Sequence, residues 1–79
     1  GNPHATLDVD AEGERWRVEL APPSRTIAAG FTEDVAKVGD EVTAIGNRSQ
    51  DETEHRMKAV RVIVNGGTYD VYPDRAPPA

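Results

Sequence analysis

The strongest constraint on the fold is a two-residue alternation of apolar and polar side chains near the start of the chain. The alternation covers residues 5–10 and returns over residues 15–20, where Trp16, Val18 and Leu20 are in the apolar phase. Successive side chains of a strand point to opposite faces of a sheet, so this period predicts two half-buried strands. Gly13 lies between them and can adopt the positive φ of a tight turn. The stretch therefore predicts a β-hairpin.

The same stretch comes close to a calcium-loop pattern. Its acids are Asp8, Asp10 and Glu12, followed by Gly13 and then by Glu19 at the twelfth position. In the EF-hand motif a helix flanks the loop on each side. Because both flanks alternate as strands here, the hairpin is favoured, with its acids facing water. A weak surface metal site of another kind stays open as an alternative.

A short helical connection is predicted over about residues 24–37. Ser24 is expected to be its N-cap, and Gly30 is placed as a C-terminal cap. Thr32 can begin a further turn over residues 33–37. The apolar residues expected to seat this segment on a sheet are Ile27, Phe31, Val35 and Val38.

Three more strands are predicted downstream of the helical segment. They cover about residues 41–46, 57–64 and 68–72, and the "NGG" between the last two predicts a hairpin turn. Residues 47–56 contain no hydrophobic residue and predict an exposed loop.

The order of these elements predicts a mainly β fold. We expect a small antiparallel OB-like β-barrel or curved sheet with one short helical connection. The OB fold has one more strand, which would precede the first hairpin and is missing here. An open sheet edge is therefore expected beside this hairpin, where a partner or a second copy can add a strand. We expect one domain over residues 1–75 and a flexible tail over residues 76–79.

Composition argues against several classes of function. The net charge is −5 and the nine basic residues form no block, which speaks against a nucleic-acid partner. The absence of cysteine excludes disulfides and thiolate metal sites. No apolar run approaches the ~18 residues of a membrane span. The chain begins without Met or a signal peptide, so we expect a processed or excised chain.

Catalysis is not expected from this sequence. Its serines, Ser24 and Ser49, lie in no nucleophile-elbow context. No carboxylate has the apolar surroundings that raise a pKa for acid–base work. The sequence therefore predicts a non-catalytic binding or accessory module of unknown ligand, without a cofactor.

Candidate contact residues lie on the hairpin and near the end of the chain. The last strand places its two tyrosines on opposite faces, so one of them is expected to be exposed. The predicted ligand contacts are His4, Arg17, Tyr69, Tyr72 and Arg75. The alternative function is binding of copper, zinc or calcium, for which the predicted ligands are His4, Asp8, Asp10 and Glu19.

Several longer stretches resemble the domain-of-unknown-function 6152 family. They are "NPHATLDVD", the pattern W-x-V-E-L-x-P-P-S-R, "GFTEDVAKVGDEVTAIGNRS" and "RMKAVRVIVNGGTYDVYPDR", and together they reach from Asn2 to Arg75. The resemblance implies a small bacterial protein with a cleaved signal peptide, in the periplasm or secreted. Members usually carry about thirty further residues before "NPH", with a strand and often a His-His pair, which this chain lacks. The family brings no established activity.

Overall fold

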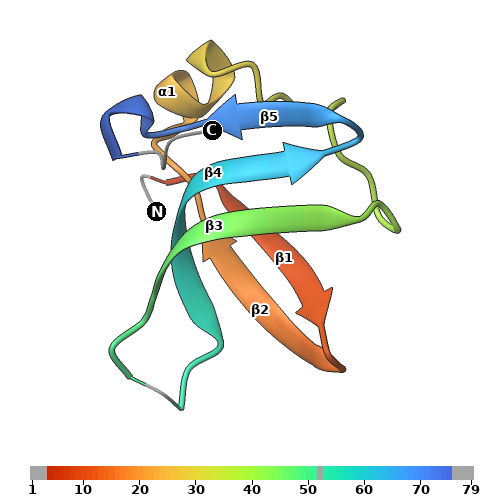
Figure 1. Ribbon diagram of the computed structural model, residues 1–79, viewed down its shortest axis with the longest axis vertical. Coiled ribbons are helices and arrows are strands. Elements are labelled where there is room, and N and C mark those ends of the chain that lie inside the picture. Colours follow the sequence, from red (N-terminus) through yellow and green to blue (C-terminus); the bar gives the residue numbers. More distant parts are fainter. Residues whose placement is uncertain (1–3, 52, 76–79) are drawn as a thin grey trace.

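The fold is mainly β, as predicted, with one short α-helix (Figure 1). The structure is a computed structural model, and it describes residues 4–51 and 53–75. The elements are β1 (Thr6–Ala11), β2 (Glu14–Glu19), α1 (Pro23–Ala28), β3 (Val42–Arg48), β4 (Arg56–Val64), β5 (Gly67–Asp70) and a 3₁₀ turn, η1 (Pro73–Arg75). No helix among these residues is long and apolar enough to cross a membrane. The predicted tail, 76–79, lies outside the described residues.

The five strands form one curved sheet that is not closed. Its order is β1-β2-β4-β3, and β5 pairs with β4 beside this path. β2 and β4 run parallel, whereas the other pairs are antiparallel. In Figure 1 the β1–β2 and β3–β4 hairpins diverge, with α1 at the end of the molecule opposite their tips. Within the described chain, β1 has β2 as its single strand neighbour, so the predicted open edge is present.

The core lies on the inner face of this sheet. β4 contributes more of it than any other element, because a register shift opposite Ile45 and Gly46 allows the successive residues Ala59 and Val60 both to be buried. The predicted apolar face of this strand is confirmed. The most deeply buried large side chains are Leu20, Val18, Val62, Val64 and Val71.

The first hairpin closes through a tight glycine turn, as the sequence predicted, and Ala11 pairs with Glu14, so the loop has two residues. Glu12 and Gly13 both have positive φ, 53° and 81°, which defines a turn of the I′ type. This turn aligns Asp8 with Arg17 and Asp10 with Arg15 across the two strands. The calcium-loop pattern therefore forms a hairpin with its charged side chains on the outer face.

Replacing Glu12 by Asn is expected to stabilise the protein by about 0.5–1 kcal/mol, because Asn tolerates positive φ better than Glu. The melting temperature should rise by roughly 2–8 °C. Glu12→Gln removes the same charge without this conformational preference and should leave the melting temperature nearly unchanged. Equal melting temperatures for the two variants would contradict the explanation.

The helical connection is shorter than predicted. It begins at Pro23, a residue suited to the first helical position, so Ser24 lies inside the helix and makes no capping hydrogen bond. The segment after Gly30, which ends the helix as predicted, forms turns rather than a further helix.

The apolar face predicted for this segment is wrong in part. Phe31 is buried and Val35 packs on the core, but Ile27 is 60% exposed and Val38 fully exposed. Thr26 takes the buried position of α1 because its hydroxyl donates to the Ala21 carbonyl at 2.8 Å. Ile27, one residue further round the helix, then faces water.

The predicted exposed loop, 47–56, is also shorter than expected. β3 continues to Arg48 and β4 begins at Arg56, since Asn47 and Arg48 pair with Lys58 and Met57. Cross-strand pairing thus extends the hairpin through residues whose polarity indicated a loop.

Candidate functional site

The candidate site is the outer edge of β1. Leu20 donates its backbone N–H to the Ala5 carbonyl at 2.8 Å, so Ala5 turns its backbone groups toward β2. In an antiparallel ladder this orientation alternates along the strand. Thr6, Asp8 and Asp10 therefore direct their N–H and C=O groups away from β2. No strand of the described residues lies on that side of β1 to form hydrogen bonds with these outward N–H and C=O groups.

A groove runs along this edge, and we call it the edge groove. It consists of two adjoining hollows of about 860 and 660 Å³, which share Thr6, Leu7 and Ala36 in their walls. One wall is formed by residues 4–10, and the other by residues of α1 and of the segment 31–42. The edge of β1 is therefore accessible along its length.

Apolar side chains form the floor of the edge groove. Buried Leu20 and Phe31 lie at one end. Leu7 and Val9 of β1 and Val42 of β3 are only half-buried, although they pack against the core. Each would lose further contact with water if apolar side chains entered the groove, and that burial is favourable.

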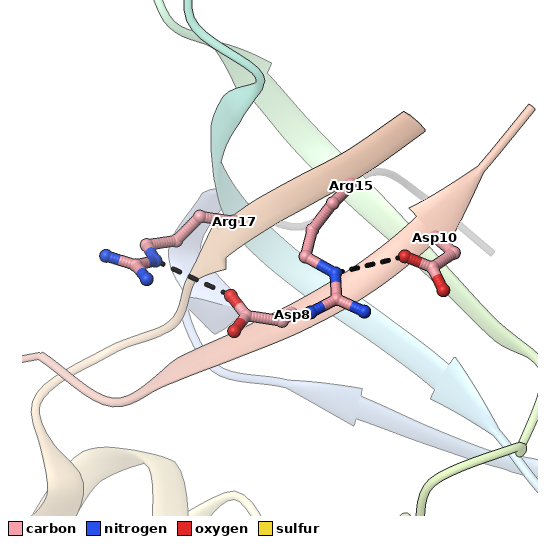
Figure 2. Close-up of polar contacts among 4 residues, drawn as sticks. All are labelled: Asp8, Asp10, Arg15 and Arg17. Carbon is pink, nitrogen blue, oxygen red and sulfur yellow. Dashed lines mark hydrogen bonds and ion pairs between the residues drawn. The ribbon is translucent and has the colours of Figure 1, made fainter. Parts of the chain in front are cut away.

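Charged pairs cover the outer face of the hairpin (Figure 2). Arg15 donates to Asp10 at 3.2 Å, and Arg17 donates to Asp8 at 3.5 Å. The hydrogen bond with Asp10 raises the pKa of Arg15 above its ordinary value. Because these side chains are exposed, the pairs hold the hairpin together only weakly.

The far wall of the edge groove is fastened to the β4–β5 turn. The Asn65 side chain donates to the Val35 carbonyl and to the Asp40 carboxylate, each at 3.0 Å. Together with the backbone N–H of Lys37, this hydrogen bond holds the pKa of Asp40 below its ordinary value. One side chain of the turn thereby fixes both ends of residues 35–40.

Replacing Asn65 by Gly keeps a residue that tolerates the positive φ of this turn but removes both hydrogen bonds. The pKa of Asp40 should rise toward its ordinary value, which a carbon-detected NMR titration measures. Because the folded pKa is lowered, Asp40 stabilises the protein above its unfolded pKa, and this contribution is lost as pH falls through the folded pKa. The variant's deficit in stability should therefore be largest near neutral pH and shrink on acidification. An unchanged titration of Asp40 would contradict the role given to Asn65.

The four predicted metal ligands are not brought together. Asp8 and Asp10 face arginines, while Glu19 is aligned with Thr6 on one side and with Lys58 on the other. His4 lies at the end of the edge groove. Over residues 4–51 and 53–75, no three His, Asp or Glu side chains are grouped closely enough to hold an ion.

The predicted ligand contacts fall into three separate places. His4 lines the edge groove, and Arg17 lies on the outer face of the hairpin. Tyr69 is half-buried and meets Phe31 edge to face at 5.5 Å, so it belongs to the packing under the groove. Tyr72 and Arg75 lie together elsewhere, 5.9 Å apart from ring centre to guanidinium carbon.

Sequence reasoning missed the far wall of the edge groove. Phe31, Val35 and Val38 were expected to seat the helical segment on a sheet, but nothing in their pattern indicates which strand the segment approaches. The prolines and glycine around α1 do signal a change of direction. They do not give its angle.

Comparisons with protein-family models, curated proteins and solved structures found no match to this chain. The resemblance to the domain-of-unknown-function 6152 family, and the periplasmic or secreted location that it implies, therefore stay predictions.

Proposed function

We propose that this protein is a non-catalytic binding module that takes up an extended segment of a partner polypeptide along β1. The observation that carries the proposal is the set of outward backbone groups at Thr6, Asp8 and Asp10, which open into the edge groove. Recognition by strand addition uses main-chain hydrogen bonds for affinity and places alternate side chains in pockets for specificity. The groove provides both.

The charge of the groove selects a basic partner. Glu33, Asp34 and Asp40 lie along the far wall, where Lys37 is the basic residue among the lining side chains. On the near wall, Asp10 is already paired with Arg15. The whole chain carries a net charge of −5, so long-range attraction favours a cationic segment. The best-fitting partner alternates apolar residues, which face the floor, with Lys or Arg, which face outward.

A second copy of the chain fits this edge less well. Two copies of β1 can pair antiparallel about a two-fold axis. If every outward-facing residue takes part, this axis passes through Asp8. This pairing places that carboxylate directly opposite its own copy and Thr6 opposite Asp10. Like charges in directly opposed positions destabilise a strand pair. Self-association through this edge is therefore an alternative that the binding experiment must exclude.

The test uses an acetylated and amidated heptapeptide of alternating Lys and Val, followed by amide NMR. Shifts should be confined to residues 4–10 and 31–42 and should saturate. Peptide lysines would lie opposite Thr6, Asp8 and Asp10, so methylating the lysine backbone nitrogens removes the hydrogen bonds that these nitrogens would donate to the β1 carbonyls. This should weaken binding more than tenfold, because each lost bond contributes about 0.5–1.5 kcal/mol.

The matched control is the same peptide methylated on its valine nitrogens, which face away from β1. It should bind nearly as well as the parent peptide, while a Glu–Val peptide should not bind. Equal binding of both methylated peptides would show attraction by charge alone and would overturn the proposal. So would concentration-dependent dimers in size exclusion that pair through residues 6–10.

A further inference from the structure

Three cations gather around one aromatic ring on a surface that the edge groove does not include. The Tyr72 ring centre lies 5.2 Å from Lys58 Nζ, 5.7 Å from Arg25 Cζ and 5.9 Å from Arg75 Cζ. None of these four residues, which we call the Tyr72 cluster, lines the edge groove. An aromatic face attracts cations through its quadrupole, so the ring explains why they approach it.

Among the residues that the structure describes, these three cations differ from most other basic residues in having no carboxylate partner. Four arginines each form an ion pair with an acid; they are Arg15, Arg17, Arg56 and Arg61. Within the part of the chain that the structure describes, Arg25, Lys58 and Arg75 form none. Glu19 is aligned with Lys58 across the ladder, and Asp74 precedes Arg75 in η1, but neither pairs with the cluster.

Different elements fix the members of the Tyr72 cluster. Lys58 projects from β4, and Arg25 from α1, which the buried hydroxyl of Thr26 fastens to Ala21. The Tyr72 backbone donates to the Val60 carbonyl at 3.3 Å, and Arg75 donates back to the Tyr72 carbonyl at 2.9 Å. The backbones that carry the three charges are therefore set in place before any ligand arrives, which lowers the ordering cost of binding.

We propose that the Tyr72 cluster binds a doubly charged oxyanion, the phosphate or sulfate group of a phosphomonoester or sulfate ester. Three like charges around one ring repel one another, and a dianion bound beside their charged groups offsets that repulsion. The two guanidinium groups offer the planar pairs of donors that suit tetrahedral oxyanions, and the Tyr72 hydroxyl adds a neutral donor. In an otherwise acidic protein the site accepts an anion that the rest of the surface repels.

The test follows Arg Nε–H and Tyr72 ring signals by NMR while glycerol phosphate is added at constant ionic strength. The signals of the Tyr72 cluster should shift and saturate, whereas sodium chloride should not move them. Lys58→Gln should weaken binding about five- to fifteenfold, the effect of removing one unit charge roughly 5 Å from a dianion in water with and without screening by physiological salt. Lys37→Gln removes the same charge from the wall of the edge groove and should change affinity less than twofold.

A second arm distinguishes a free phosphomonoester from a lipid headgroup. Vesicles of phosphatidylcholine with phosphatidic acid are sedimented with the protein, next to vesicles of phosphatidylcholine alone. Saturable binding of glycerol phosphate would identify the ligand as a soluble ester. If the protein binds only the vesicles with phosphatidic acid, and this binding depends on Lys58, the ligand is a lipid headgroup on a membrane surface. Equal losses from Lys58→Gln and Lys37→Gln, or no binding in either arm, would overturn the proposal. Neither result bears on peptide binding at β1.

Discussion

Gly46→Ala is expected to destabilise the protein by about 2–4 kcal/mol, the range of a severe overpacking substitution. A Cβ on Gly46 would collide with the Lys58 carbonyl oxygen and would lie 2.8 Å from Ala59 Cα. Both neighbours are backbone, so no side chain can rotate away. The β3–β4 ladder must separate at its register shift, and the melting temperature should fall by roughly 10–25 °C.

Gly13→Ala is the control for this substitution. Gly13 has a positive φ of 81°, but a Cβ there would meet nothing within 4 Å. The cost should be limited to the conformational strain of about 1–2 kcal/mol. A Gly46→Ala variant that melts at or above the Gly13→Ala variant would contradict the close approach of β3 and β4.

Leu20→Ala is expected to cost about 2–5 kcal/mol, because truncating a buried leucine loses transfer free energy and leaves a cavity. Leu20 is 1% exposed and lies between the core and the edge groove. A domain of 79 residues has about 4–12 kcal/mol of stability in total. The variant should therefore lose much of its resistance to urea, which equilibrium unfolding followed by Trp16 fluorescence measures.

Ile27→Ala is a matched control, since it also truncates a large aliphatic side chain beside the same groove. Ile27 is 60% exposed, so its loss should change the free energy of unfolding by less than about 0.5 kcal/mol. Similar losses from the two substitutions would show that the core does not lie where the structure places it.

The strands could be predicted because their signals are local. Alternation around Gly13 and the valines of residues 60–64 specify strands and inward faces without any knowledge of the partner strand. The "NGG" turn is equally local, since Asn65 and Gly66 both have the positive φ that such a turn requires. These parts of the prediction are confirmed.

The edge groove depends on contacts between residues far apart in the sequence. The hydrogen bond from Asn65 to Val35 joins residues 30 positions apart, and no sequence pattern around either residue predicts it. The exposure of Ile27 has a more local cause, because a buried threonine bonded to Ala21, five positions earlier, sets the rotation of α1. The Tyr72 cluster likewise joins α1, β4 and η1, so the sequence indicated Tyr72 and Arg75 but not Lys58 or Arg25.

Hydrogen exchange at β1 tests the proposed function most directly. In the free protein, the amides of Thr6, Asp8 and Asp10 should exchange quickly, while those of Leu7 and Val9, which face β2, should exchange slowly. With a saturating Lys–Val peptide, the first three amides should gain at least tenfold protection, and the lysine-methylated peptide at the same concentration should give much less. Slow exchange of Thr6, Asp8 and Asp10 in the dilute free protein, or no added protection with the peptide, would contradict strand addition at this edge.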